Sequence, residues 1–342
     1  MKARIVTALA VAALAGCQSN STVELVPQQT KHISQGVYLV EFSFAQHFSQ
    51  QADLLEKVVG DYCQTGENLE AVALHWHHSM ESWMALQGQE RGPQTALEQS
   101  WNVQFWPDKK NTTGRKMSAL LRQSNPNWRA EDIATQSVTV QGLGALEWLI
   151  YDSASDFKTN RNTCQLGLAI SENLTNNANT IARAWQTNPW LELSEKDWDS
   201  ECIALLSNQL DYSMKKLSRP LAKVGKPRAY FAESWRSGTS MLNLRQNIAA
   251  LEQLYLADGR GLDARLRQLD KASLADRITE QFQLTLNTWP MDHSLFELLQ
   301  SKEGYRTVLA QFNKLERLNY LIHEEVAIEL GVVIGFNATD GD

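Results

Sequence analysis

Residues 161–187, RNTCQLGLAISENLTNNANTIARAWQT, carry the pattern that decides the fold. Apolar side chains recur every three or four residues through this stretch, which is the spacing of one face of an α-helix. The stretch ends at Thr187-Asn188-Pro189, where the proline disfavours helix at the residue before it. The sequence therefore predicts a long amphipathic helix that stops near the middle of the chain.

The same helical spacing recurs on both sides of this break, whereas period-two alternation is nearly absent. Residues 137–141 (SVTVQ) are the main exception, and we expect a short extended segment there. Long helices are expected at about 33–63, 67–90, 143–152, 161–187, 195–222, 232–257, 274–299 and 302–331. Because these divide four plus four, we predict an all-α protein of two four-helix bundles, residues 32–188 and 189–342.

An irregular insertion, residues 91–141, separates the second and third of these helices. It contains several prolines and tryptophans, including the run Phe105-Trp106-Pro107-Asp108-Lys109-Lys110. Connections of this length in compact domains are usually functional or contain short helices of their own. We expect both, with short helices near 94–100, 113–123 and 129–136.

The first 17 residues, MKARIVTALAVAALAGC, have the features of a bacterial lipoprotein signal. Lys2 and Arg4 precede an apolar run, and Leu14-Ala15-Gly16-Cys17 resembles a lipobox. The apolar run is too short to favour a stable transmembrane helix. We therefore expect residues 1–16 to be removed and Cys17 to be lipidated; an ordinary secretory signal, with Cys17 incidental, is the alternative.

Either signal takes the chain out of the cytoplasm. Lipidation predicts attachment to the membrane through Cys17, followed by a polar tether over residues 17–31. Gln18, where an inner-membrane lipoprotein would have Asp, is typical of sorting to the outer membrane of two-membrane bacteria. We expect a lipid-anchored protein of the cell envelope that faces the periplasm.

Charge excludes one class of partner. The chain has 342 residues, and removal of the first 16 leaves 326. Loss of Lys2 and Arg4 changes the formal net charge from -7 to -9, and no long basic run follows. Nucleic acid is therefore not expected as a partner.

Three cysteines, Cys63, Cys164 and Cys202, remain after Cys17, so at most one internal disulfide can form. Cys63 ends the first predicted helix and Cys164 begins the fourth. In an up-down-up-down bundle these two helix ends are neighbours. We predict a Cys63–Cys164 disulfide, with three buried free thiols as the alternative.

Residues 142–152, GLGALEWLIYD, resemble the imelysin family of bacterial envelope proteins, whose signature is G-x-H-x-x-E followed by aromatic and apolar residues. Gly142 and Glu147 match the signature, but Gly144 stands where the family has histidine. Three further stretches resemble the family, and they occur in the family's order: 105–110, 232–240 and 335–342. The resemblance extends from about His32 to the C-terminus.

The resemblance implies a fold of two α-helical bundles related by a pseudo-twofold axis, a suspected metallopeptidase activity and a link to iron acquisition. On a helix, H-x-x-E places imidazole and carboxylate on one face, where both can ligate a cation. Gly144 removes that nitrogen ligand, and a zinc hydrolase needs about three protein ligands. We therefore predict a non-enzymatic binding or accessory protein in iron acquisition, with iron or another divalent cation as the candidate cofactor.

Two alternatives stay open. One is a metallopeptidase with a rearranged metal site, and the other is a scaffold that docks a periplasmic partner protein through residues 91–141.

Glu147 lies in an apolar stretch, and a buried carboxylate must be paired or neutralised. Arg236 is the predicted partner, which would place the site in a cleft between the bundles. The candidate ligand-binding residues are Glu147, Trp148, Glu233, Trp235, Arg236, Ser237 and Ser240. The alternative is a structural ion pair with core aromatic neighbours and hydroxyls that bond back to helix carbonyls.

Two further stretches have metal-ligand chemistry. His75, His78 and Glu81 are three to six residues apart on one predicted helix, so one face could present two ligands. Asp340 and Asp342 belong to an oxygen-rich terminus suited to a hard cation such as calcium. A solvated helix face and a disordered acidic tail are the respective alternatives.

Overall fold

The computed structural model describes residues 25–123, 125, 127–291 and 294–332. The signal peptide, Cys17, Asp340 and Asp342 therefore lie outside the described residues, as does most of the predicted tether. Within the described ranges the regular elements are helices, and no strand occurs. The all-α class predicted from helical spacing is confirmed.

Four helices form the first bundle: α1 (Gln35–Thr65), α2 (Leu69–Met84), α7 (Gly142–Tyr151) and α8 (Arg161–Ala184). Helix α1 packs along α8 and α2, and α7 packs against the same two helices. The second bundle contains α9 (Glu195–Leu221), α10 (Ser240–Leu256), α12 (Ala272–Asn287) and α14 (Lys302–Asn319). Here α9 and α12 each contact α10 and α14.

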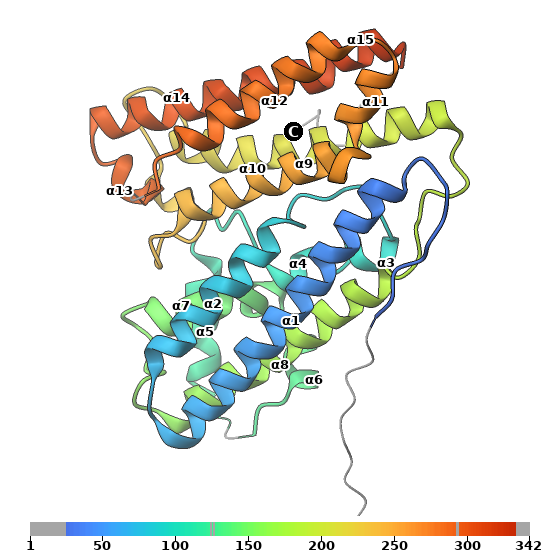
Figure 1. Cartoon of the computed structure of the whole chain (residues 1–342). Coiled ribbons are helices and arrows are strands. Elements are labelled where there is room, and N and C mark those ends of the chain that lie inside the picture. The colour runs from blue at the N-terminus through green and yellow to red at the C-terminus, as the bar shows by residue number, and fades with distance from the viewer. Residues whose placement is uncertain (1–24, 124, 126, 292–293, 333–342) are drawn as a thin grey trace, which may run out of the picture.

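The two bundles lie one across the other, and the second bundle is at the top of Figure 1. The chain passes from α8 to α9 through residues 185–194, which include the predicted break at Asn188. The pseudo-twofold relation between the bundles stays a prediction.

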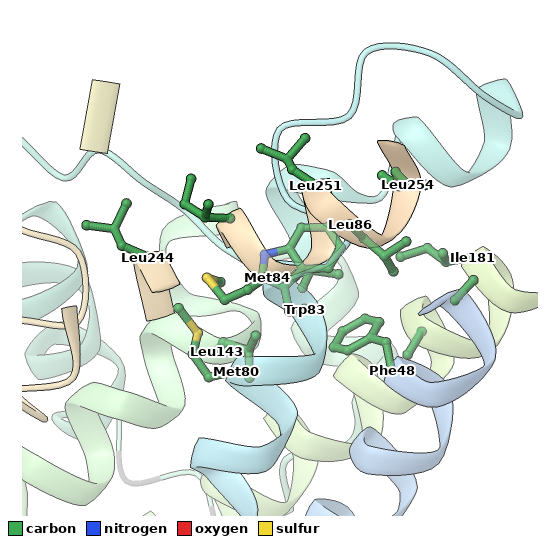
Figure 2. Packing of buried hydrophobic residues seen from close by; sticks show 14 of the residues in the cluster. Phe48, Met80, Trp83, Met84, Leu86, Leu143, Ile181, Leu244, Leu251 and Leu254 are labelled. Atoms are coloured by element: carbon green, nitrogen blue, oxygen red, sulfur yellow. The ribbon is translucent and has the colours of Figure 1, made fainter. Parts of the chain in front are cut away.

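One hydrophobic core continues through both bundles. Helix α10 of the second bundle packs against α2 and α1 of the first. Figure 2 shows Leu244 and Leu251 of α10 beside Met84 and Trp83, at the end of α2. Because a shared, closely packed core resists sliding, groups on facing surfaces of the two bundles keep a fixed geometry.

Three predicted long helices are shorter than expected. The helix predicted over 232–257 begins at Ser240, because Ser234 (φ 50°) and Gly238 (φ 75°) have left-handed backbone. The helix predicted over 274–299 ends at Asn287, and Pro290 cannot continue it. The helix predicted over 67–90 ends at Met84, followed by a turn.

Shorter helices fill the connections. Residues 302–331 contain α14, a π-helical turn η4 (Tyr320–Glu325) and α15 (Val326–Leu330). The second bundle also has η2 (Ala229–Phe231), η3 (Ala257–Gly259), α11 (Leu262–Gln268) and α13 (Leu295–Leu298).

The insertion contains short helices, as expected: α3 (Gln94–Leu97), α4 (Ser100–Val103), α5 (Thr112–Leu121) and α6 (Ala130–Ala134). The prediction of an extended segment at 137–141 is wrong, because Val138–Val140 form a 3₁₀ turn, η1. The side-chain amide of Gln141 donates to the carbonyl of Gln136 and closes that turn locally. Local hydrogen bonding therefore prevails over the strand preference of the two valines.

A disulfide joins Cys63, near the end of α1, to Cys164, in the first turn of α8, with a Cα–Cα distance of 5.5 Å. This is the pairing expected from the bundle topology. Cys202 is free and buried in α9, and burial raises the pKa of its thiol to about 12.

The described end of the predicted tether lies against the first bundle instead of being free. The backbone amide of Gln28 donates to the hydroxyl of Tyr38 at 2.9 Å, and its side-chain oxygen accepts from the amide of Asn188 at 3.0 Å. None of the helices in the described ranges has both the length and the apolarity that a membrane crossing requires.

Candidate functional site

A small pocket opens where the two bundles meet the insertion. Helix α7 contributes Gly144 and Glu147, the insertion contributes residues from 104 to 113, and the segment before α10 contributes residues from 230 to 236. The cavity volume is ≈ 40 Å³. Since one water needs about 10–15 Å³ on this measure, the pocket holds an ion or a few waters, and a peptide does not fit.

Glycine fixes the entry of α7 into this pocket. Gly142 has φ 61°, and a Cβ there would lie 2.1 Å from the carbonyl oxygen of Val103. The start of α7 is therefore packed directly on the backbone of α4, and this close approach requires glycine at residue 142. Gly144 is different, because a Cβ there would meet only the carbonyl oxygen of Phe105, at 4.0 Å.

Glu147 lines the pocket as a buried carboxylate, as does Glu233, and 6 % of the surface of Glu147 is exposed. The backbone amide and the hydroxyl of Ser237 both donate to its Oε1, each at 2.9 Å. Its Oε2 accepts no hydrogen bond from the described residues. Burial raises the pKa of Glu147, while the bonds from Ser237 and the nearby charge of Arg236 oppose that shift.

Arg236 does not form the predicted ion pair with Glu147. Its Nε instead donates to Asp152 at 2.7 Å, just past the end of α7, and its second guanidinium nitrogen donates to Asn111 at 2.8 Å. The guanidinium also lies over the ring of Trp235, 4.3 Å from its centroid. Backbone and hydroxyl donors of Ser237 already satisfy Glu147 Oε1, so Arg236 is free to pair with the more exposed aspartate.

Glu233 belongs to a buried polar network between the bundles. Its carboxylate lies 2.5 Å from Nζ of Lys216, which is completely buried in α9. It also accepts from Gln87 at 2.5 Å and from Gln104 at 2.9 Å. Nζ of Lys216 further donates to Gln87 at 2.8 Å and to Asn247 of α10 at 2.7 Å. Burial lowers the pKa of Lys216, and Glu233 opposes that shift.

Lys216, Gln87 and Gln104 are not among the residues predicted from the sequence. One signal was present, because Lys216 continues the buried stripe of α9 that includes Gln209 and Ser213. A lysine on an otherwise buried helix face requires a partner.

The other predicted ligand residues divide into two groups. Trp235 lines the pocket and packs against Tyr230 and Phe296, with ring centroids 5.0 and 5.8 Å away. Trp148 is 1 % exposed and belongs to the core, while the hydroxyl of Ser240 donates to the carbonyl of Glu233. The structure therefore brings Glu147, Glu233, Trp235 and Arg236 into the pocket, with Ser237 behind Glu147, and binding by them stays a prediction.

The second predicted metal site is elsewhere. His78 and Glu81 line a different pocket, between α1, α2 and α10. His75 does not line that pocket, and its ring lies 5.7 Å from the ring of His78. These side chains do not converge with Glu147. In the described part of the chain, no three His, Cys, Asp or Glu residues form a group that could hold a metal ion. Calcium binding at the terminus stays a prediction outside the described residues.

The insertion shows little exposed apolar surface. Trp101 is 53 % exposed, and it is the one large apolar side chain with high exposure in the described part of 91–141. A large aromatic patch would have favoured the scaffold alternative, and these residues do not form one.

Comparison with known proteins gives the family. The model of the imelysin family, Peptidase_M75, matches residues 43–322. An imelysin-like protein from Psychrobacter arcticum 273-4 has a similar structure, with a TM-score of 0.72 at 21% identity, covering 91% of this chain and 100% of the other. A protein from Parabacteroides distasonis ATCC 8503, described as a "putative iron-regulated protein A precursor", has a TM-score of 0.62 at 14% identity, covering 87% and 95%.

The comparison with curated proteins found no match. At these identities the two solved structures show a shared fold alone. The family model, however, spans most of the sequence and includes the pocket at α7. The chain belongs to the imelysin family.

Proposed function

We propose that this protein is a lipid-anchored imelysin of the cell envelope that binds a small cation, iron or another divalent metal, without catalysing a reaction. Anchoring through Cys17 on the periplasmic side of the outer membrane is part of the proposal. A role in iron acquisition is supported by the family and by the iron-regulated description of one structural neighbour.

The state of Glu147 is the observation that carries the proposal. Oε1 is held by two hydrogen bonds from Ser237 in the other bundle, which orients the carboxylate, while Oε2 has no donor among the described residues. Glu147 as a residue is largely buried, and a buried carboxylate is costly unless it is paired or neutralised. The pocket beside it has space for an ion with a water or two.

The same residues argue against hydrolysis. Gly144 offers no nitrogen ligand to a metal at Glu147, and Lys216 already pairs with Glu233. A catalytic zinc needs about three protein ligands and an open position. The chemistry that remains is reversible binding by oxygen ligands, which suits hard or borderline cations.

Titration calorimetry of the mature chain with Fe²⁺, Zn²⁺ and Ca²⁺ tests the proposal. We expect Glu147→Gln to weaken binding at least about tenfold, because a charged ligand is lost while the amide oxygen still accepts from Ser237. Glu81→Gln is the matched control, since Glu81 lines the other pocket. Binding that survives Glu147→Gln unchanged, or that is lost in Glu81→Gln instead, would overturn the assigned site.

A further inference from the structure

A second and larger pocket lies on the other side of Gln104 and Trp106, which it shares with the Glu147 pocket. Its cavity volume is ≈ 330 Å³, which is within the range of small-molecule sites. Three parts of the chain enclose it: the turn after α2, the α3–α4 segment of the insertion and one face of α9. The proposed function at Glu147 makes no use of this pocket.

Two cations line this pocket from the same face of α9. Lys215 and Arg219 are four residues apart, and Tyr212 and Asn208 continue the stripe toward the N-terminal end. Neither cation has a carboxylate within 4.0 Å in the described ranges of the chain. The guanidinium of Arg219 lies over the ring of Trp106, 5.7 Å from the centroid.

Aromatic rings form the remaining walls. Trp106 and Tyr212 meet edge to face, with centroids 5.6 Å apart. Trp101 packs on Phe105 at 5.7 Å and is half-exposed at the pocket. An exposed tryptophan and two cations in one pocket provide an apolar surface for a ring and a positive field for an anion.

The walls are held in place by close packing. Gly88 has φ 82°, and a Cβ there would lie 2.6 Å from Cβ of Tyr212, so the turn after α2 rests directly on α9. The side-chain amide of Gln89 donates to the buried carboxyl of Glu41 at 2.5 Å. A pocket with rigid walls loses little entropy when it binds a ligand.

We propose that this pocket binds a planar aromatic carboxylate, with the ring against Trp101 and Trp106 and the carboxylate at Arg219 and Lys215. Two carboxylates also line it, but Asp211 has an interaction of its own and Glu90 is exposed. The cations next to the rings therefore set the preferred charge of the ligand. Arg219 can donate two parallel bonds to a carboxylate, which a lysine cannot.

The test is a charge series on one ring, measured by calorimetry on the mature chain at low salt: benzoate, neutral benzamide and cationic benzylamine. We expect benzoate to bind at least about tenfold more tightly than the other two, the effect of one charge-assisted contact. Arg219→Gln should weaken benzoate binding at least about tenfold, and Trp101→Ala should weaken it about fivefold.

Arg228→Gln is the matched control, because Arg228 also lies over an aromatic ring, that of Phe231 at 5.3 Å, but does not line this pocket. Its benzoate affinity should equal that of the wild type, and so should that of Glu147→Gln. Failure of benzoate to bind, equal affinities across the series, or equal effects of Arg219→Gln and Arg228→Gln would each overturn the proposal.

Discussion

Gly144 is the residue that most limits the chemistry of the first pocket. It lies within α7 and has ordinary helical backbone, so neither turn geometry nor packing requires glycine there. Gly144 and Glu147 line the same pocket, and a Cβ at residue 144 would lie 4.0 Å from the carbonyl oxygen of Phe105. The pocket is thus lined by a glycine at the position where the family signature has histidine.

Gly144→His should create a metal site with Glu147, because positions i and i+3 share one helix face. We expect Zn²⁺ affinity to rise at least about tenfold, equivalent to ~1.4 kcal/mol from one added ligand. Gly144→Ala is the control, since it also replaces glycine by a residue of higher helix propensity but adds no metal ligand. Calorimetry that gives the two variants equal Zn²⁺ affinities would show that residue 144 does not face the site.

A buried charged residue is easier to predict from a sequence than the partner that satisfies its charge. Glu147 was identified because a carboxylate stands out in an apolar helix, and its burial follows directly. The predicted partner of Glu147, Arg236, is wrong. Whether Arg236 or Ser237 reaches the carboxylate depends on where the segment before α10 turns. That turn is produced by the left-handed backbone of Ser234 and Gly238, and Ser234 gives no signal of such a conformation.

At the scale of elements, α1 carries a carboxyl in the core. Glu41 is 0 % exposed, and Gln89 donates to its Oε2 while Oε1 has no hydrogen-bond partner among the described residues. Burial raises the pKa of Glu41 well above its ordinary value, and the bond from Gln89 only partly opposes this. The folded state therefore binds a proton there at pH values where the unfolded chain has released it.

Glu41→Gln should stabilise the protein at neutral and alkaline pH. Stability from the protonated carboxyl is fully present below the unfolded pKa, and it is lost as the pH rises through the folded pKa. An amide does not titrate, so the variant's advantage in free energy of unfolding should grow from pH 4 to pH 8. Urea unfolding across this range, with Glu56→Gln of the same helix as control, is the measurement. A difference that does not change with pH would contradict the assignment.

The ends of the helices show which sequence features determine where a helix stops. The bounds of α1, α7 and α8 lie close to the predicted ones, because strong periodicity continues to each end. Helix α12 stops early because Pro290 follows, a local signal that the periodicity of the apolar residues concealed. The order of the helices was predictable from pattern, but the segments that form both pockets are the irregular ones between them.

At the scale of the whole molecule, two contacts of different kinds hold the bundles together. One is the apolar packing of α10 on α2, which is continuous with the core of each bundle. The other is the Lys216 network, in which α9 and α10 contact the end of α2 and the insertion through charged and amide groups. Glu233 of this network lines the Glu147 pocket, and Gln104 lines both that pocket and the larger pocket beside Trp106. The network therefore fixes a wall that the two pockets share.

Lys216→Met should lower the free energy of unfolding by about 3–5 kcal/mol, because it leaves Glu233 buried without its counterion. The double variant Lys216→Met/Glu233→Gln should recover most of this loss, since neutral groups of similar size replace the pair. Lys314→Met is the matched control, because Nζ of this α14 lysine donates to Thr288 and Gln311 and to no carboxylate among the described residues; it should cost less than about 1 kcal/mol. Urea unfolding at pH 7 compares the four proteins. Should the double variant be no more stable than Lys216→Met, the loss would come from packing around the lysine stem and not from the unpaired charge of Glu233.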